Sequence, residues 1–282
     1  MKSLIKQGIK STLQFLVQLT GKTRLGRYFH NQLLRAAMEH VAVVDHDGTK
    51  LSFAAPNTLC RWRADTFSTK EPETLEWIDR MPEGSVLWDV GANVGLYSVY
   101  AAKRRKCRVW AFEPSVFNLE LLARNIFLND LAQQVCIVPL ALSDRLASSH
   151  LRMTTTDWGG ALSTFDKGFG WDGKAIQQVF EFQTLGLTMN DACERLGIPR
   201  PEFLKMDVDG IEHLILSGGA DILRTVKGVL VEVNDDFTDH ADQIKHHLTK
   251  AGLVLKEKRH SEIIASSTTG FANCYDQIWA RD

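Results

Sequence analysis

The clearest chemical signal in the sequence is a glycine turn that follows an apolar segment, with the pattern Asp89-x-Gly91-x-x-x-Gly95. Glycine lets the backbone approach a ligand closely, and a helix that follows such a turn directs free N–H groups at it. Glu113 stands about 20 residues further on, where a carboxylate accepts hydrogen bonds from ribose hydroxyls. The pattern predicts a nucleoside-containing ligand, although a tight turn without any ligand uses the same glycines.

The spacing of the glycines separates two classes of ligand. A dinucleotide fingerprint needs Gly-x-Gly-x-x-Gly to bring the main chain against a pyrophosphate, but Asn93 occupies the third position here. A carboxylate at Asp89 would repel a pyrophosphate, whereas it suits the ammonium of an aminoacyl group. These residues favour S-adenosylmethionine. A nicotinamide-dependent reductase is a competing hypothesis, which the lack of a Tyr-x-x-x-Lys pair also disfavours.

A parallel sheet would bring these residues together. From residue 84 onward apolar segments alternate with helical ones, which predicts an α/β fold with helices on both faces of the sheet. The expected strands are 86–90, 108–112, 135–140, 202–206, 228–233, 253–257 and, after a hairpin-like region at 261–270, an antiparallel strand at 274–280. Ligands bind beyond the carboxyl ends of the central strands in such sheets. The run 148–182 breaks the alternation and predicts a long functional loop.

The chain is expected to divide into an arm at 1–40, a cap at 41–83 and a ligand-binding domain at 84–282. On a helical wheel, residues 2–20 place apolar side chains opposite lysine and glutamine. Three interpretations of this helix stay open: docking on this protein or a second subunit, contact with an anionic membrane, and a mitochondrial transit peptide. The cap predicts a β-hairpin around Asp47-Gly48 and a helix that begins at Glu71-Pro72.

Composition excludes several classes of protein. The 282 residues include 33 basic and 34 acidic ones, and this balance argues against a protein that binds nucleic acid. The charges are unevenly placed, because the first 38 residues hold seven basic residues and no acid. Five cysteines without a Cys-x-x-Cys pair predict buried thiols in a reducing compartment. No apolar run is long enough to span a membrane, so we expect a cytoplasmic protein, with membrane association through the arm as an alternative.

An ordered set of motifs between Asn57 and Val233, about three fifths of the chain, resembles the FkbM-type S-adenosylmethionine-dependent methyltransferases. The motifs are Lys70-Glu71-Pro72, LWDVGANVGLYS at 87–98, AFEP at 111–114, ALSD at 141–144, FLKMDVDGIE at 203–212 and LVEV at 230–233. The sequence departs from the family's usual KxDVEG at Asp209, where the family carries Glu. The shorter side chain keeps the charge and changes the reach, so Asp209 is a candidate substrate contact.

The resemblance implies a Rossmann-like methyltransferase sheet of seven strands and methyl transfer from S-adenosylmethionine to a hydroxyl oxygen. By matching motif, the methionine part of the cofactor would lie against Asp89, Gly91, Asn93 and Gly95, with Glu71 beside them. Glu113 would bind the ribose, and Ser143 and Asp144 would lie near the adenine. Helix or turn capping is the alternative role for Asp144, and a solvated strand end is the alternative for Glu113.

Methyl transfer to an alcohol also needs a group that accepts the hydroxyl proton. Asp207 is the first candidate because it closes the fourth strand, and Glu212, His213 and Glu232 follow. Capping of the next helix is the alternative role for Asp207 and Glu212. The Pro-Pro-aromatic sequence expected of an amine methyltransferase is absent after this strand, which favours oxygen as the acceptor atom. Asp207, Asp209, Glu232 and Asp235 offer oxygen ligands, but clustering in sequence is not coordination, and we predict no metal.

The acceptor is the least determined part of the prediction. Trp62, Trp158 and Trp171 stand in expected loops or the cap, where an aromatic ring can stack on a sugar face; each is equally suited to a core. The resemblance favours a hydroxyl of a sugar, glycolipid or secondary metabolite. A homo-oligomer is compatible with the arm, and a non-catalytic scaffold held at a membrane is a further alternative.

Overall fold

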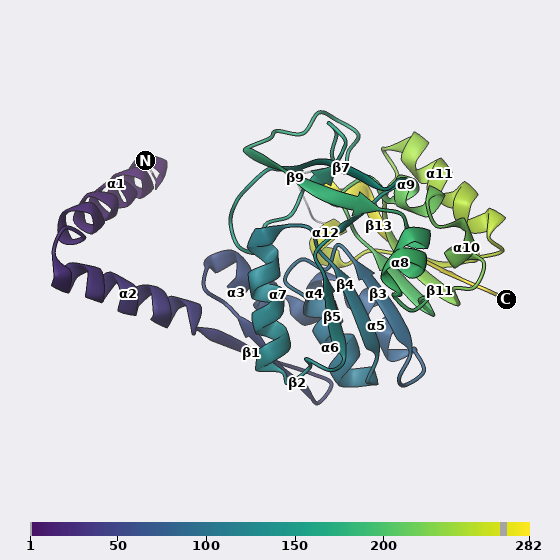
Figure 1. Ribbon diagram of the computed structural model, residues 1–282. Helices are drawn as coiled ribbons and strands as arrows, with labels where there is room; N and C mark the ends of the chain where they lie inside the picture. Colours follow the sequence, from purple (N-terminus) through teal and green to yellow (C-terminus); the bar gives the residue numbers. More distant parts are fainter. Residues whose placement is uncertain (1, 266–269) are drawn as a thin grey trace.

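A seven-stranded sheet forms the centre of the computed structural model, which describes residues 2–265 and 270–282 (Figure 1). Its strands are β3 (Val86–Val90), β4 (Arg108–Phe112), β5 (Val135–Val138), β10 (Phe203–Met206), β11 (Gly228–Asn234), β12 (Val254–Arg259) and β13 (Cys274–Ala280). They lie in the order β12-β13-β11-β10-β3-β4-β5. The four central strands and β5 are parallel, whereas β13 is antiparallel to both of its neighbours. The predicted mostly parallel sheet with an antiparallel last strand is therefore confirmed.

Helices cover both faces of this sheet, as predicted. One face packs against α5 (Pro72–Asp79), α6 (Leu96–Arg105) and α7 (Val116–Leu128), and the other against α8 (Met189–Leu196), α9 (Glu212–Ser217), α10 (Ala220–Leu223) and α11 (Thr238–Lys250). Neighbouring residues of β3 show the division, because Leu87 belongs to the first core and Trp88 to the second. Successive side chains of a strand point to opposite faces. A strand buried on both faces is therefore mostly apolar, and the buried charges of Asp89 on β3 and Lys205 on β10 are exceptions.

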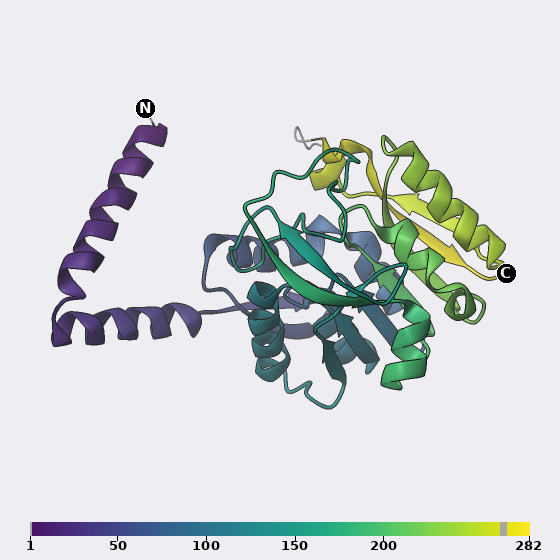
Figure 2. The same ribbon diagram turned by 45° about the horizontal axis from the view of Figure 1, so that its top comes forward.

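The run at 148–182 is not the long loop that the sequence predicts. It contributes to a second, four-stranded sheet made of β6 (Ala141–Leu142), β7 (Ala147–Met153), β8 (Thr164–Phe165) and β9 (Phe180–Leu187), in the order β6-β9-β7-β8 (Figure 2). β7 and β9 pair antiparallel along seven residues of each strand. The loop prediction was wrong because this pairing joins segments that are far apart in the sequence. Residues 154–163 and 166–179 remain as loops between the strands.

The cap is built as the sequence predicts, around a hairpin of β1 (Val41–His46) and β2 (Thr49–Ala54). Asp47 and Gly48 both have positive φ, as the tight turn requires. Two short helices follow, α3 (Thr58–Asp65) and α4 (Phe67–Lys70). Leu51 and Phe53 of β2 are buried against α6 and α7, so the cap shares one core with the main sheet.

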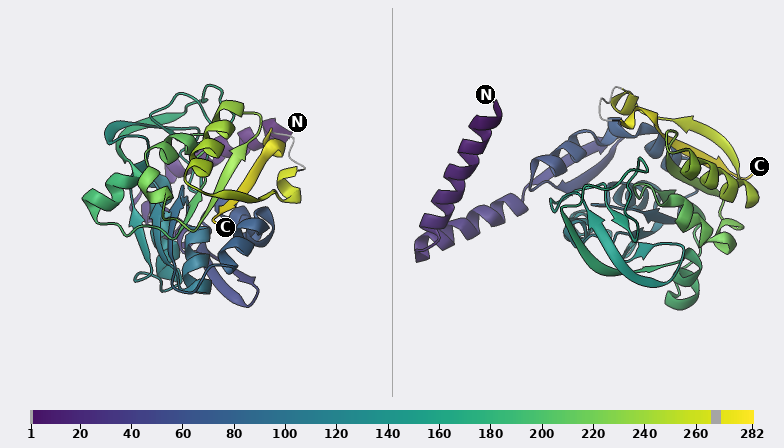
Figure 3. Two further views of the ribbon diagram at one scale, coloured as in Figure 1. Left: turned by 90° about the vertical axis from the view of Figure 1, so that its right-hand side faces the viewer. Right: turned by 90° about the horizontal axis from the view of Figure 1, so that it is seen from above.

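The arm contains two helices, α1 (Lys2–Thr20) and α2 (Arg24–Met38). Figures 1 and 3 show both helices standing away from the rest of the molecule. At the other end of the chain, α12 (Glu262–Ala265) occupies the start of the region expected to be hairpin-like, and the short 3-10 helix η1 (Phe271–Asn273) precedes β13. Residues 266–269 of that region lie outside the described residues.

Two further expectations concern the whole chain. None of the helices in the described ranges is long and apolar enough to cross a membrane. All five cysteines are unpaired, and Cys60, Cys107 and Cys274 are buried as expected. Cys136 is exposed, contrary to the prediction, because it lies on β5 at the edge of the sheet.

Candidate active site

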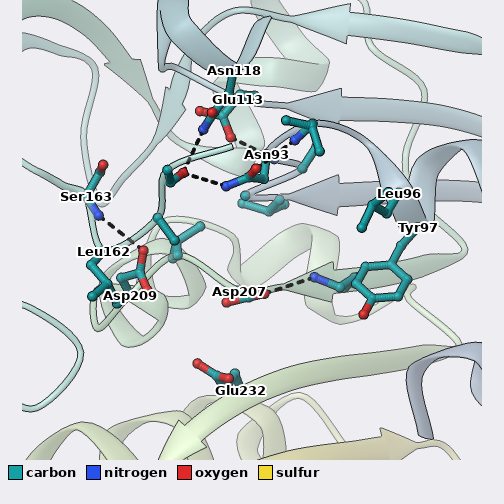
Figure 4. Close-up of a pocket in the computed structure, with 18 of the residues that line it drawn as sticks. Asn93, Leu96, Tyr97, Glu113, Asn118, Leu162, Ser163, Asp207, Asp209 and Glu232 are labelled. Atoms are coloured by element: carbon teal, nitrogen blue, oxygen red, sulfur yellow. Dashed lines mark hydrogen bonds and ion pairs between the residues drawn. The ribbon is translucent and has the colours of Figure 1, made fainter. Parts of the chain in front are cut away.

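A cavity of about 590 Å³ lies at the carboxyl ends of the central strands. Its lining includes the glycine turn after β3, the end of β4, the segment after β10 and part of β11. Helices α3 and α4 of the cap, and α12 near the end of the chain, complete it. Figure 4 shows the polar side chains that face this space. The cavity stands where a sheet of this kind binds its ligands.

The glycine turn is fixed by close packing of the backbone. Gly91 has a φ of +81°, and a Cβ there would lie 1.9 Å from the carbonyl oxygen of Asp207. Gly95 begins α6 with a φ of +82°, and a Cβ there would lie 2.3 Å from Leu122 Cδ1. Gly91 lines the cavity, whereas Gly95 packs against α7 behind it. Only glycine fits either position without displacing its neighbours.

Glu113 and Asn93 lie side by side in the cavity wall (Figure 4). The two carboxylate oxygens of Glu113 accept hydrogen bonds from the backbone N–H groups of Asn93 and Ser115, each at 2.8 Å. Burial raises the pKa of Glu113 to about 7. The amide of Asn93 donates to the carbonyl oxygen of Gly160 at 2.7 Å, which ties the turn to the loop after β7. The side chain of Asn118 also stabilises the carboxylate, and the lone pair that remains can accept a hydrogen bond from a ligand hydroxyl.

Apolar residues form the wall next to Glu113. Phe112, Leu140 and Leu142 line the cavity there. Ser143 and Asp144, which the family resemblance places near an adenine, are not in the cavity lining. The Ser143 hydroxyl donates to Asp144 Oδ1 at 3.2 Å, and Asp144 also pairs with Arg145. The apolar residues before Ser143, rather than the Ser-Asp pair itself, are the surface that a flat ring would meet.

Asp89 lies beneath the cavity, on β3, and is 1% exposed. Its Oδ2 accepts a hydrogen bond from the Ser98 hydroxyl at 2.6 Å, and its Oδ1 lies 3.9 Å from the ammonium of Lys205. Burial raises the pKa of Asp89, against the attraction of Lys205. Within the described part of the chain Asp89 Oδ1 accepts no hydrogen bond. Asp89 therefore acts on the cavity through Lys205.

Lys205 and Lys70 supply positive charge to the cavity, and the sequence singled out neither as a site residue. Lys205 is 2% exposed in the middle of the sheet, and its ammonium lies 3.4 Å from Asp207 Oδ2 and 5.1 Å from the centre of the Tyr97 ring. Burial alone would lower the pKa of Lys205, but the carboxylates of Asp207 and Asp89 outweigh burial and raise it. A charged residue inside the apolar strand 203–206 was the signal that could have revealed it.

Glu71 also faces the cavity and pairs with Lys70. Burial opposes the ionisation of Glu71, but the ammonium groups of Lys70 and Lys205 prevail and lower its pKa to about 2. This carboxylate is therefore ionised at neutral pH. Because the two lysines hold it, Glu71 is part of a charge network rather than a free acid.

Asp207 and Glu232 both line the cavity, on neighbouring strands (Figure 4). The Asp207 side chain is 31% exposed. Burial raises the pKa of Glu232 well above its usual range, and the carboxylates of Asp207 and Asp276 add to this effect. Asp276 stands directly across from Glu232 on β13. The cavity thus holds a partly exposed carboxyl group, Asp207, beside a buried one, Glu232, whose pKa is raised.

Asp209 lines the cavity, whereas Glu212 and His213 do not. Asp209 Oδ2 accepts a hydrogen bond from Ser163 N–H at 3.2 Å, and burial together with the charge of Asp207 raises its pKa to about 7. Burial, with the neighbouring His240, lowers the pKa of His213 to about 4. His213 is therefore neutral at neutral pH and lies behind the site.

Glu212 holds the segment that carries the two aspartates. Its carboxylate accepts hydrogen bonds from the N–H groups of Val208 and Gly210, at 3.0 and 3.1 Å, and it lies 2.6 Å from His240 Nε2. Burial would raise the pKa of Glu212, but His240 reverses this effect and lowers it. With three partners and 1% exposure, Glu212 is placed to position the segment rather than to touch a ligand.

Of the three tryptophans considered for sugar stacking, Trp62 lines the cavity, whereas Trp158 and Trp171 do not. The Trp158 carbonyl oxygen accepts from the Asn57 amide at 2.9 Å, and its side chain packs against a small apolar cluster. The Trp171 ring stacks on Phe271, which lines the cavity, with the ring centres 4.0 Å apart. Trp171 thus supports the cavity wall from behind.

No group of three metal ligands gathers at the cavity in the described ranges. The carboxylates that the sequence offered as ligands, among them Asp207 and Asp209, do not form one. The single such group in these ranges is His46, Asp47 and Asp79 in and beside the cap. Asp79 already accepts hydrogen bonds from Tyr100 and Arg104.

The sheet order, the antiparallel β13 and the cavity beyond the central strands define a Rossmann-like methyltransferase fold. The profile of the methyltransferase FkbM domain matches residues 89–255. The chain therefore belongs to the FkbM methyltransferase family and is a methyltransferase. The match contains the glycine turn, Glu113 and the segment 203–212, which are the motifs that carry the resemblance in the sequence.

Two methyltransferases and several hundred chains of solved structures are similar to this chain. The hexuronic acid methyltransferase AglP of Haloferax volcanii is 23% identical over 208 residues, which are 72% of this chain and 78% of that protein. The methyltransferase sdnD of Sordaria araneosa is 26% identical over 180 residues, 55% of this chain and 68% of that protein. The crystal structure of methyltransferase FkbM from Methylobacillus flagellatus has a TM-score of 0.50 at 12% identity, over 91% of this chain and 59% of that chain. This last similarity shows the fold alone.

Proposed function

We propose that the protein transfers a methyl group from S-adenosylmethionine to a hydroxyl oxygen of a sugar, glycolipid or secondary metabolite. The observation that carries the proposal is one cavity that joins a glycine turn and a ribose-type carboxylate to a second pair of carboxyl groups. The glycine turn and the ribose-type carboxylate suit a nucleoside, and the pair of carboxyl groups suits a proton-transfer step. The relative AglP, named for hexuronic acid, supports a sugar as acceptor.

The cavity residues fit S-adenosylmethionine. Gly91 lines the cavity, and its lack of a side chain lets the turn pack directly against the backbone of Asp207 at the cavity wall. Glu113 offers a lone pair for a ribose hydroxyl, and Phe112, Leu140 and Leu142 offer an apolar surface for the adenine. Glu71, Lys70 and Lys205 offer both signs of charge, which an aminoacyl group requires. When bound, S-adenosylmethionine supplies an electrophilic methyl group.

Asp207 is the proposed general base. Its carboxylate lies 3.4 Å from the ammonium of Lys205, and its side chain, 31% exposed, lines the cavity. When the methyl group passes from the cofactor sulfur to the acceptor oxygen, with the S–C bond breaking as the O–C bond forms, Asp207 would take the proton of that hydroxyl. Burial raises the pKa of Glu232 well above its usual range, which favours its protonated form, and that form can donate a hydrogen bond to the acceptor.

Enclosure of the acceptor is the second contribution of the chain to the reaction. Trp62 and Phe67 of the cap line the cavity on one side, and Ile264 and Phe271 on another. Apolar walls exclude water and hold the acceptor oxygen in line with the methyl group, and both effects speed a displacement reaction.

The proposal is tested by titrating the full chain with S-adenosylmethionine and, separately, with NAD in a calorimeter. We expect binding of the first ligand alone. Turnover with a labelled methyl donor is then measured on free sugars, nucleotide sugars, lipid-linked sugars and amines. Label recovered on a hydroxyl of a sugar supports the proposal. Binding of NAD without S-adenosylmethionine, or label recovered only on amines, would overturn it.

A further inference from the structure

The arm formed by α1 and α2 exposes an apolar face on each helix. Ile9, Leu13 and Leu16 follow one another at helical spacing on α1, as do Leu25, Phe29 and Leu33 on α2, and these side chains are between 47% and 77% exposed. No residue of α2 is buried. Figure 2 shows both helices clear of the sheets and of the helices that cover them. Within the described residues, these faces therefore have no partner on the body of the chain.

The arm also carries only positive charge. The first 38 residues hold seven basic side chains and no acidic one. On α2, Leu25, Phe29 and Leu33 lie on one face and Arg24 and Arg35 on the other, with Leu34 on the side of Arg27. Apolar residues on one face and cations on the other are typical of a helix that lies in a membrane interface.

Close backbone contact and hydrogen bonds hold the junction between α1 and α2. A Cβ at Gly26 would lie 1.9 Å from the carbonyl oxygen of Thr20, so α2 begins in close contact with the end of α1. The Thr20 hydroxyl lies 2.8 Å from His30 Nε2, and Arg27 donates to the carbonyl oxygen of Gly21 at 3.1 Å. The arm thus presents its two helices as one unit.

The positive charge of the arm distinguishes among three possible partners: a second copy of the chain, a nucleic acid and an anionic membrane. Pairing with the arm of a second copy would bring seven basic residues against another seven, without the acidic residues that flank paired helices. A nucleic acid would neutralise the cations but leave the apolar faces in water. We propose that the α1–α2 arm is a docking surface for an anionic phospholipid membrane, which meets both requirements. This inference needs no assumption about the methyl acceptor.

The test uses the full chain and sedimentation with lipid vesicles. We expect binding to vesicles of phosphatidylcholine with phosphatidylglycerol, little binding to phosphatidylcholine alone, and weaker binding as salt is raised, because exposed charges are screened. Phe29→Glu places a negative charge on the apolar face of α2 and should lower the bound fraction at least tenfold. Asn31→Glu makes the same change of charge on the polar face and should lower it by less than threefold.

The arm lies outside the cavity, so both variants should keep the circular dichroism of the parent chain and its turnover of a water-soluble acceptor. Equal losses of vesicle binding in the two variants would overturn the proposal, because charge alone would then account for binding. Absence of binding to the mixed vesicles would also overturn it. If light scattering then showed a dimer that Phe29→Glu dissociates, the partner of the arm would be a second copy.

Discussion

The protonation state of the Glu113 side chain should control the affinity for S-adenosylmethionine. Its ionised form accepts a hydrogen bond from a ribose hydroxyl, and burial raises its pKa to about 7. The affinity for S-adenosylmethionine should therefore rise with pH up to about 7 and then level off. In Glu113→Gln we expect an affinity lower by about tenfold to a hundredfold, from the loss of a charge-assisted bond, and no rise with pH. Calorimetry between pH 5.5 and 8.5 measures both effects.

Asp144→Asn is the matched control for Glu113, since it removes a carboxylate of the cofactor motif that is not in the cavity lining. Its affinity should equal that of the parent chain at each pH. An unchanged affinity in a folded Glu113→Gln variant would contradict the ribose assignment.

Asp207→Asn tests the general base. The amide keeps the shape of the side chain and cannot accept the proton, so turnover should fall roughly a hundredfold or more. The affinity for S-adenosylmethionine should stay within a few fold, measured by calorimetry beside a single-turnover assay. Asp235→Asn, just beyond β11 and outside the lining, serves as the control. If turnover survives in Asp207→Asn, the base is Glu232 or another group, and loss of cofactor binding would instead identify Asp207 as structural.

The glycine turn shows how an element, rather than a side chain, shapes the site. Gly84 and Gly91 have nearly the same φ, +79° and +81°, but a Cβ at Gly84 meets nothing within 4 Å. Gly84→Ala should therefore cost only the strain of a left-handed residue, about 1 to 2 kcal/mol. Gly91→Ala adds a collision with the Asp207 carbonyl, and should lower stability further and abolish cofactor binding. Urea unfolding and calorimetry of the two variants separate strain from collision, and equal behaviour would contradict this account.

The segment 207–210 depends on Glu212 in a different way. Glu212→Ala leaves two buried backbone N–H groups and His240 without their acceptor, which should cost about 3 to 5 kcal/mol of unfolding free energy. Glu212→Gln keeps one acceptor oxygen and should recover part of that loss. Urea unfolding at neutral pH measures both. If the alanine variant were as stable as the parent chain while turnover vanished, Glu212 would act in the chemistry itself.

The elements differ in how far local sequence could predict them. The strands of the main sheet are short apolar runs, so β3, β4 and β13 could be predicted close to their observed ends. β7 and β9 could not, because pairs such as Leu151 and Phe182 form only when distant segments meet. The helix predicted over residues 2–20 matches α1, but the sequence did not single out the second helix of the arm, α2.

The residues of the site also differ in how far the sequence could predict them. Motifs identified Gly91, Asn93 and Glu113, whose roles follow from neighbouring residues. The partners of Asp89 depend on strand register, which places Lys205 directly beside it on β10. Register is a property of the assembled sheet, and no spacing within the sequence contains it. The sequence therefore indicated the nucleoside end of the cavity better than the charge network at its other end.

At the scale of the whole molecule, burial of Glu113 makes stability depend on pH. The folded chain holds the Glu113 proton up to about pH 7, whereas the unfolded chain releases it near the ordinary value of 4.5. Stability should therefore be greater below pH 4.5 as far as this group is concerned, and fall as pH rises from 4.5 to 7, by at most about 1.4 kcal/mol per pH unit.

Urea unfolding of the cofactor-free chain at pH 5, 6 and 7.5 measures this fall, with Glu113→Gln as the reference. The glutamine variant lacks the titrating group, so the difference in stability between the two chains should shift in its favour as pH rises. A difference that stays constant over this range would contradict the raised pKa.

The position of β13 has a consequence for how the chain is made. β12 precedes β13 in the sequence, yet it meets the sheet only through β13, which lies between β12 and β11. During synthesis β11 emerges from the ribosome before β13, so one of its edges has no neighbouring strand. β12 also emerges before β13 and then has no strand to pair with. β13 then completes the sheet by inserting between β11 and β12, rather than by adding to an outer edge of the sheet. Until that step the apolar edge of β11 is open to other nascent chains, so we expect the chain to be most prone to aggregation in this interval.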